Sequence, residues 1–523
     1  MCADFSIFVN FLVTGCRIMG VDSQMLGTTG QYVVPLVLPI ILPCVLLLLV
    51  RRLWYEYNVM SRDPASDLPL PDGSMGWPVI GETIGFGLQG SQFYEKKFRQ
   101  HGRLFKTHLF GRPTVRVRGA DNIRKILHGE NDIVKSYWPA TTQLLIGPES
   151  LTQSQGVHHV KLRKHVMTAF SHTALSGYIS LIHPIMIKTI HDWCQVPGGV
   201  AGYPECRLLT FMVAGKVLCG FDCSKEETTK LIDYFEEIVH CFFSLPINLP
   251  GSGLNRGLKA RDYIRQRIMA NITLKETDDT QDALRILMDQ KNEAEETPSH
   301  ENIAANAIDL LVAGYASTAS AACSVIIQLY KNRQILTKVR QELKEHGMDV
   351  SGSQLTLLKI NELKYVTSVV KEVLRMSPPI GAAFRKALRT FELDGKQIPA
   401  GWTLLYSIRE TIDFADVFTD KAKFDPDRFA SERREDKTGD RYNFCIFGGG
   451  SRSCIGKAFA VLLLRMLVIE LARTCNWELL EPDTLKIAHL PTPHPVDGMP
   501  VRFTKLEDVD HNANSVVFNC ESE

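Results

Sequence analysis

One cysteine of the sequence lies in a glycine-rich loop, FGGGSRSCIG, at residues 447–456, directly before a long apolar run. Such a loop has three competing chemical uses: it can cradle a phosphate, carry a nucleophilic cysteine, or present a thiolate to a metal. The phosphate-binding pattern GxxxxGK[ST] fails twice, because Ser451 and Ala458 stand where it requires a glycine and a hydroxyl. A nucleophilic cysteine stays open, since its general base cannot be found from linear distance.

The same loop satisfies the pattern F-x-x-G-x-R-x-C-x-G through Phe447, Gly450, Arg452, Cys454 and Gly456. The glycines permit tight turns around a sulfur, and the helix expected to follow would aim its N-terminal amides at Cys454, which favours the thiolate. This pattern resembles the haem-binding loop of the cytochrome P-450 superfamily. The resemblance implies that Cys454 is the axial thiolate ligand of the iron in haem b, with Phe447 and Arg452 beside the cofactor.

Cationic side chains elsewhere match positions that contact the haem propionates in the superfamily. His159 and Arg163 are four residues apart and share a helix face, and the resemblance implies that they contact the propionates together with Arg385 and Arg452. For each of these side chains, a solvated surface position remains the alternative.

A second matching set predicts a structural charge network. Glu372 and Arg375 match the ExxR helix motif of the superfamily, and Arg428 in FDPDRF matches its later partner. The resemblance implies that the three side chains form a buried network behind the haem. Removing one member would leave an unpaired buried charge, so we expect such a change to be severe.

The long apolar segment at residues 303–330 departs from the superfamily at its centre. Members usually carry Ala/Gly-Gly-x-Asp/Glu-Thr-Thr there, whereas this chain reads AGYAST, and Ala316 replaces the acid. The catalytic candidates are Ser317, at the usual threonine position, and Thr318, because a hydroxyl can relay a proton. The alternative for Ser317 is a hydrogen bond back to the helix carbonyl one turn earlier. We expect proton delivery to rely on ordered water rather than on a carboxylate.

Long stretches between residues 68 and 503 resemble the family-26 retinoic acid hydroxylases, among them FKTHLFGRPTVRVRGADNIRKIL, FFSLPINLPGSGL and PPIGAAFRKALRTFELDGKQIP. Retinoic acid is an apolar polyene that ends in a carboxylate, so its pocket needs apolar walls and a cation at one end. The resemblance implies substrate contacts from Trp138, Phe243, Val312, Ala313 and the loop at 380–383, with Arg112 and Arg116 as candidates for the carboxylate. The alternative for the arginines is the solvated face of an ordinary strand, because Arg116 and Arg118 alternate with valines.

The implied activity is a haem-thiolate monooxygenation of all-trans-retinoic acid, at carbon 4 of the ring, which inactivates it. No dinucleotide- or flavin-binding segment is recognised, so electrons from NADPH would come through a separate cytochrome P-450 reductase. Two alternatives remain: a related oxygenase that acts on a sterol or another lipid, and a haem-binding sensor or carrier without turnover, which Ala316 favours.

Mainly helical elements with small sheets must position these residues. Helical periodicity predicts helices at 160–170, 303–330, 335–346, 363–376 and 456–474, the second of them central and buried. Alternating β-branched residues predict strands within 105–119. The expected fold is that of a cytochrome P-450, with a single large haem domain at 73–509 and a tail at 510–523.

Composition excludes some partners. The 59 basic and 58 acidic side chains give a net charge of +1, which offers no basis for binding nucleic acid. The 13 cysteines include no CxxC pair, so neither a disulfide framework nor a zinc site is indicated, and a reducing compartment is favoured.

A membrane anchor is expected at residues 33–50, which carry no charge and would form a helix of roughly 27 Å. A cleaved signal peptide is disfavoured, because Arg51 and Arg52 follow instead of a small-residue cleavage site. Residues 1–32 would be luminal or interfacial, and 51–72 a proline-containing linker. These features predict a single-pass protein of the endoplasmic reticulum membrane whose catalytic domain faces the cytosol.

Overall fold

The computed structural model describes residues 43–58, 60–275, 280–290, 298–489 and 492–506. The chain divides into two compact units, of which one is Met1–Pro64 with Trp77–Val79 and the other is Ala65–Gly76 with Ile80–Glu523. The predicted segments 1–32 and 510–523, and residues 33–42 of the predicted anchor, lie outside the described residues.

In the first unit, residues 43–58 form one helix whose side chains are mostly exposed. The helix continues past residue 50 and therefore includes residues 51–58, which we had placed in the linker. These eight residues contain neither proline nor glycine, and Arg52 pairs with Glu56 one turn later at 3.6 Å. The proline-containing part of the linker starts only after this helix.

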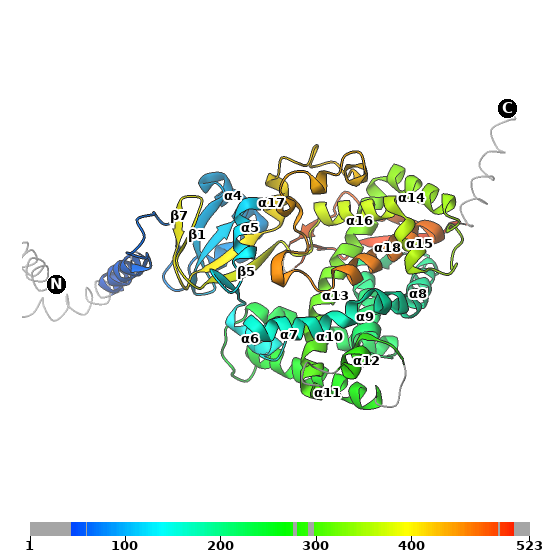
Figure 1. Ribbon diagram of the computed structural model, residues 1–523, viewed down its shortest axis with the longest axis horizontal. Coiled ribbons are helices and arrows are strands. Elements are labelled where there is room, and N and C mark those ends of the chain that lie inside the picture. Colours follow the sequence, from blue (N-terminus) through cyan, green and yellow to red (C-terminus); the bar gives the residue numbers. More distant parts are fainter. Residues whose placement is uncertain (1–42, 59, 276–279, 291–297, 490–491, 507–523) are drawn as a thin grey trace, which may run out of the picture. The chain divides into compact units, whose positions relative to one another are not determined.

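Helices make up most of the second unit (Figure 1). They are α3 (Thr83–Gln89), α4 (Ser91–His101), α5 (Ala120–His128), α6 (Ala140–Ile146), α7 (Gly156–Met167), α8 (His172–Cys194), α9 (Gly202–Cys219), α10 (Lys225–His240), α11 (Gly253–Lys275), α12 (Ala283–Asp289), α13 (His300–Lys331), α14 (Arg333–Glu345), α15 (Leu357–Glu362), α16 (Lys364–Met376), α17 (Arg409–Phe414) and α18 (Lys457–Thr474).

The strands are short and form small sheets. They are β1 (Leu104–Leu109), β2 (Arg112–Val117), β3 (Val134–Ser136), β4 (Val200–Ala201), β5 (Ala382–Ala387), β6 (Phe391–Leu393), β7 (Lys396–Ile398), β8 (Thr403–Ser407), β9 (Cys475–Leu479), β10 (Ile487–Ala488), β11 (His494–Pro495) and β12 (Pro500–Lys505). The predicted class, mainly helical with small sheets, is confirmed.

The largest sheet has the strand order β1-β2-β8-β5-β3. Its strands pair antiparallel except for β2 and β8, which run parallel. The register places Arg116 opposite Leu405, and Leu405 opposite Phe384, so the three side chains follow one another across one face of the sheet. Aromatic residues of α4 pack on this face, where Phe93, Tyr94 and Phe98 form a core cluster with Leu405.

Helix α13 runs through the core of this unit and packs against α9, α11, α16 and α18 (Figure 1). Its N-terminus is capped by the Ser299 hydroxyl, which accepts a hydrogen bond from the Asn302 amide. Within the described part of the chain it is the one helix long and apolar enough to cross a membrane, but 67% of its apolar window is buried, as in a core helix. Burial is interrupted at its centre, where Ala313 is exposed and Val312 and Ser317 are half-buried.

Candidate active site

The cysteine loop folds into a tight turn that presents its sulfur. Gly448 and Gly450 have φ angles of +68° and +64°, and a Cβ on Gly450 would lie 2.6 Å from the carbonyl oxygen of Leu127. The amide of Cys454 donates to the carbonyl of Phe447 at 2.8 Å, which closes the turn. The Cys454 side chain is exposed just before α18 begins at Lys457.

Two opposed effects determine the pKa of Cys454. The pKa of its thiol is raised, chiefly because the surrounding protein removes water from the thiolate, while the Gly456 amide and the Arg163 and Lys457 side chains act in the opposite direction. The amides at the start of α18 act in the predicted direction, toward the thiolate, but the removal of water around the sulfur outweighs them. A metal cation bound to the sulfur would reverse this balance, because a coordinating thiol loses its proton.

Helix α7 lies beside this loop and carries two of the predicted propionate contacts. Arg163 donates from Nη2 to the Ser453 carbonyl at 2.8 Å, which ties α7 to the residue before the cysteine. His159 is buried, and burial, together with the charges of Arg452 and Arg163, lowers its pKa to about 4. This lowered pKa favours the neutral imidazole, which can donate a hydrogen bond, while a propionate beside it would act in the opposite direction.

Glu130 joins the other two arginines and was not predicted from the sequence. Its Oε1 accepts from Arg452 Nε at 3.1 Å, and its Oε2 lies 2.9 Å from Arg385 Nε, with its side chain only 3% exposed. Arg452 also donates from Nη2 to Ser154 O at 2.7 Å and to Gln155 Oε1 at 3.0 Å. Two guanidinium groups thus share one carboxylate, and the cluster keeps a net positive charge.

The predicted charge network is assembled in the structure. Glu372 accepts hydrogen bonds from Arg375 Nε at 2.7 Å and from Arg428 Nε at 3.0 Å. All three side chains are at most 2% exposed. Glu435, which the sequence did not point to, accepts from Arg428 Nη1 at 2.7 Å. Every charge of this set therefore has a partner, as a buried network requires.

The central turn of α13 has hydroxyls but no acid. Ser317 donates from Oγ to the Ala313 carbonyl at 2.8 Å, which is the backbone contact that we kept as its alternative. Thr318 is buried. Ser317 remains half-buried beside the exposed Ala313, so its hydroxyl can still turn toward a group on that face.

Two polar side chains of α13, one and two turns before Ala313, bind the loop that leads into α7. Asn306 Oδ1 accepts from the Leu151 amide at 3.1 Å, and Asp309 accepts from the amide and hydroxyl of Thr152 at 2.8 and 2.7 Å. The same loop supplies the carbonyl of Ser154 that receives Arg452. Helix α13 and the cysteine loop are thereby connected through residues 151–154.

Aromatic side chains gather around two of the predicted substrate contacts. Phe243 stacks on Phe110 with ring centroids 5.2 Å apart, and Trp138 lies 6.3 Å from Phe384. Phe110 and Phe384 are themselves 6.3 Å apart, so they connect the two predicted residues. We refer to Phe110, Trp138, Phe243 and Phe384 as the aromatic cluster. The ring contacts that join this cluster do not include α13, on which Val312 and Ala313 lie.

The two candidate carboxylate-binding arginines have different surroundings. Arg112 is exposed, and its guanidinium lies 5.7 Å from the ring of Tyr137, next to Trp138 in the chain. Arg116 is 2% exposed, donates from Nη2 to Glu410 at 3.1 Å and lies 3.8 Å from the Tyr94 ring. Its Nε and Nη1 have no hydrogen-bond partner among the described residues. The alternative interpretation, that Arg116 lies on a solvated face of the strand, is therefore wrong for this residue.

Comparisons with known proteins agree with this geometry. The family model described as Cytochrome P-450 matches residues 71–493. Cytochrome P-450 26A1 of Danio rerio is 42% identical over 478 residues, which cover 89% of this chain and 96% of that protein. Cytochrome P-450 26B1 of Homo sapiens is 41% identical over 486 residues, which cover 91% and 94%. The chain belongs to the cytochrome P-450 family.

One solved structure extends the likeness to three dimensions. Cyanobacterial CYP120A1, with retinoic acid bound, superposes with a TM-score of 0.78 at 30% sequence identity. The match covers 84% of this chain and 100% of that chain. The predicted cytochrome P-450 fold and monooxygenase class are thus confirmed.

A cytochrome P-450 binds haem through a cysteine thiolate and takes electrons from a redox partner. The residues present fit that cofactor: Cys454 offers an accessible sulfur, and Arg385 and Arg452 share the single carboxylate of Glu130, so they keep a net positive charge that a propionate would offset. In this cytochrome P-450, Cys454 would hold the iron, while His159, Arg163, Arg385 and Arg452 would meet the propionates.

Proposed function

We propose that this cytochrome P-450 hydroxylates all-trans-retinoic acid at ring carbon 4 and thereby inactivates it. Haem b, held by Cys454, would supply the activation of dioxygen, and an NADPH-dependent reductase would supply the electrons. The named relatives and the retinoic acid bound to CYP120A1 support the substrate class.

The observation that carries this proposal is the position of Arg116. It is a buried cation with two guanidinium nitrogens lacking hydrogen bonds, and the sheet register aligns it with Phe384 of the aromatic cluster. A buried donor without an acceptor is costly, so a ligand that supplies a carboxylate there would be favoured. Apolar walls that lead to a cation match an apolar acid and do not match a neutral sterol.

The roles of the other residues follow from their places. Arg112 is exposed and lies near Tyr137, the residue before Trp138, so it would attract the carboxylate as the substrate enters from solvent. The aromatic cluster would contact the polyene. Val312, Ala313 and the loop at 380–383 would place the ring. Ser317, with Thr318 beside it, would exchange its bond to the Ala313 carbonyl for one to water and pass on a proton without help from an acid at Ala316.

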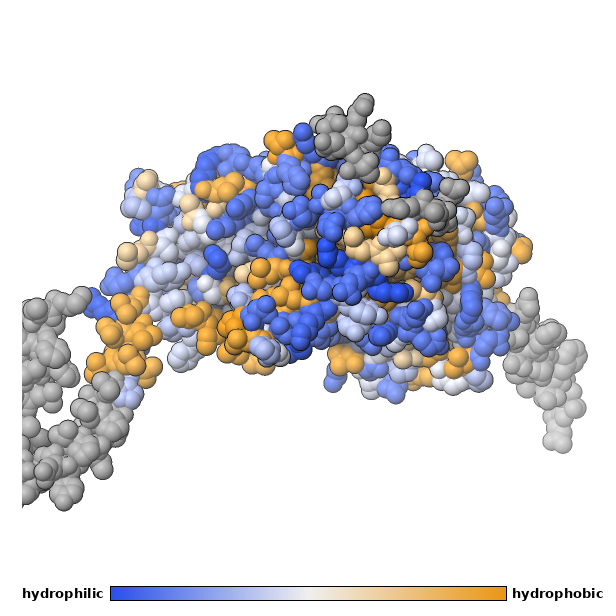
Figure 2. Space-filling model, turned by 90° about the horizontal axis from the view of Figure 1, so that it is seen from below, coloured by the Kyte–Doolittle hydropathy of each residue, from blue (hydrophilic) through white to orange (hydrophobic). Residues whose placement is uncertain are grey.

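We further propose an endoplasmic reticulum membrane location, with residues 33–50 as the anchor and the catalytic domain on the cytosolic side. Exposed apolar residues of the second unit agree with a membrane surface: Leu245, Ile247 and Leu249 are 73%, 49% and 62% exposed. Hydrophobic side chains form patches on the face seen in Figure 2.

Retinoate binding to the haem-loaded protein, followed by its effect on the haem absorption spectrum, tests the substrate. Arg116→Gln should raise the retinoate Kd by about ten- to a hundredfold, because it removes a charge-assisted hydrogen bond. Glu410→Gln is the matched control, since it breaks the same ion pair but keeps the cation, and it should leave the Kd unchanged or lower it. Retinol, which lacks the carboxylate, should bind wild type and Arg116→Gln equally.

The same preparation, supplied with reductase and NADPH, should form 4-hydroxyretinoic acid. The proposal is wrong if a sterol shifts the haem spectrum and retinoate does not, or if NADPH is consumed without oxidised product. A reduced carbon monoxide complex that lacks the red-shifted thiolate band would remove Cys454 as the ligand.

A further inference from the structure

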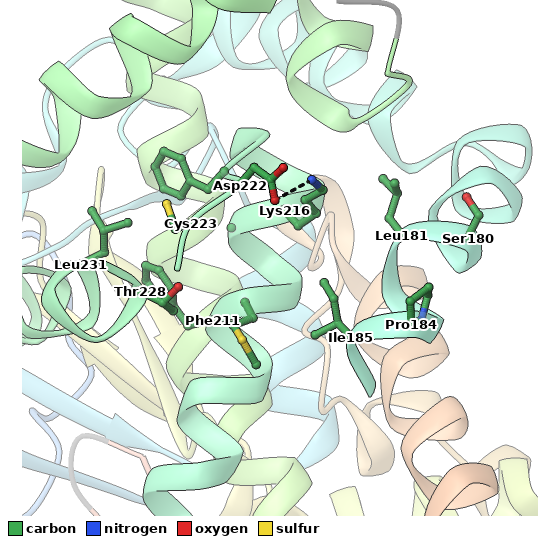
Figure 3. Close-up of a pocket in the computed structure, with 13 residues that line it drawn as sticks. Ser180, Leu181, Pro184, Ile185, Phe211, Lys216, Asp222, Cys223, Thr228 and Leu231 are labelled. Atoms are coloured by element: carbon green, nitrogen blue, oxygen red, sulfur yellow. Dashed lines mark ion pairs between the residues drawn. The ribbon is translucent and has the colours of Figure 1, made fainter. Parts of the chain in front are cut away.

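A cavity lies apart from the candidate active site, between α8, α9 and α10 (Figure 3). Its volume is about 370 Å³, within the usual range for small-molecule pockets. Leu181 and Ile185 of α8 face Thr228 and Leu231 of α10 across it, and Phe211 of α9 lies between them (Figure 3).

The walls and floor of this cavity are mostly apolar. Phe211, Phe221 and Leu231 are buried, and Gly215, one turn after Phe211, leaves the floor without a side chain. Leu181 and Ile185 are half-buried and Pro184 is exposed, so the apolar body of a ligand could remove their surface from water.

One cation stands at its edge. Lys216 Nζ lies 3.2 Å from Asp222 Oδ1, drawn as a dashed line in Figure 3. The two side chains differ in exposure, since Lys216 is 29% exposed and Asp222 is 90% exposed. The aspartate is almost fully hydrated and holds the lysine weakly, so an incoming carboxylate can take its place at little cost.

Helix α13 separates the cavity from the candidate active site. Phe211 contacts Tyr315 of α13 with ring centroids 5.3 Å apart. Tyr315 is two residues from Ala313 and Ser317, which is about 200° around a helix, so it points away from their face. A ligand in this cavity would leave the haem side of α13 free.

We propose that this cavity binds a small apolar monocarboxylate, with the chain over Phe211 and Phe221 and the carboxylate on Lys216. A neutral compound would not use the lysine, and an amphipathic amine would meet the like charge of Lys216 and could pair only with Asp222, whose carboxylate is 90% exposed to water. The inference does not depend on the proposed substrate, because none of these residues belongs to the candidate active site.

Decanoate, below its micellar concentration, is a suitable probe, and Cys223 is a built-in reporter. Cys223 lines the cavity and is half-buried, while Cys194, also half-buried and on α8, does not line it. The haem-loaded protein, with clotrimazole added to fill the haem site, would be treated with N-ethylmaleimide and mapped by peptide mass spectrometry. Decanoate should slow alkylation of Cys223 and leave that of Cys194 unchanged.

Two variants test whether the charge of Lys216 strengthens decanoate binding. For each variant, the rate of Cys223 alkylation with decanoate is compared with the rate without it. Lys216→Met keeps the length of the side chain and should weaken protection about tenfold. Asp222→Asn releases the lysine and should strengthen it about two- to threefold. The proposal is overturned by absent protection, by equal protection from decan-1-ol or decylamine, by equal protection in Lys216→Met, or by equal protection of Cys194.

Discussion

At the scale of single residues, Glu130 has the largest predicted effect on stability. Its one carboxylate serves Arg385 and Arg452, and Glu130→Gln would leave two buried guanidinium groups without a counter-charge. We expect a loss of about 3–5 kcal/mol in the free energy of unfolding, measured by urea denaturation of the haem-free protein, in which no propionate can replace the carboxylate.

The control for this change is Asp132→Asn, two residues away. Asp132 pairs with Arg389 at 3.0 Å, but both side chains are more than half exposed. Asp132→Asn should lower the free energy of unfolding by no more than about 0.5 kcal/mol. Similar small losses for both variants would show that the shared carboxylate is not needed.

Ser317 can be tested separately from its helix. Ser317→Ala removes a hydroxyl that in this structure bonds to the Ala313 carbonyl, and we expect product formed per NADPH consumed to fall by about tenfold. Ser324→Ala is the matched control, because Ser324 makes the same bond to Ser320 on the same helix at 2.9 Å but is buried in the core. Unchanged coupling in Ser317→Ala would exclude a role for its hydroxyl.

At the scale of elements, the contact between α13 and the loop at 151–154 should depend on pH. Burial raises the pKa of Asp309 from 3.8 to about 6, although the hydrogen bonds from Thr152 oppose the shift. The folded state therefore binds more protons than the unfolded state between these values, and the free energy of unfolding falls as the pH rises from about 4 to 6.

Asp309→Asn removes this dependence. Relative to wild type, the variant should gain about 2 kcal/mol in the free energy of unfolding between pH 4 and pH 7. Denaturant melts over this range measure the difference, with the fully exposed Asp416→Asn as a control that should show no such slope. A flat difference for Asp309→Asn would mean that its carboxyl ionises normally.

The helices could be predicted from the sequence because their signals are local. The periodic segments correspond to α7, α13, α14, α16 and α18, and the alternating segments to β1 and β2. The sheet order could not be predicted, since Thr114 of β2 pairs with Thr403 of β8, far along the chain. Without that pairing, neither Phe384 nor Glu410 could be assigned to the surroundings of Arg116.

Residues of the candidate site that belong to a family motif could be predicted from the sequence. Residues that pair with them but belong to no motif could not. Cys454, Arg163 and Arg452 follow from short patterns in the sequence. Glu130 follows a helix as an ordinary acidic residue, and its pairing with two arginines arises only from tertiary structure. The balance of burial against the helix end at Cys454 also depends on surrounding atoms that a sequence does not place.

At the scale of the whole molecule, the anchor proposal concerns the first unit and can be tested independently of the second. Full-length protein in microsomes should stay in the pellet after alkaline carbonate extraction, since an apolar helix resists removal by charge and pH. Protease added to intact microsomes should digest the catalytic domain. Release by carbonate, or protection of the domain, would contradict the proposed topology.

The pairing of Glu130 with Arg452 also limits when the site can form during synthesis. The two residues are 322 positions apart, so at 5–20 residues per second the ribosome needs roughly 16–64 s to supply the second after the first. Until Arg385 has been made, Glu130 lacks both of its arginine partners, and until Arg452 follows, the shared ion pair is incomplete. The nascent chain therefore cannot enclose this part of the pocket early, and haem can be captured only by a nearly finished polypeptide.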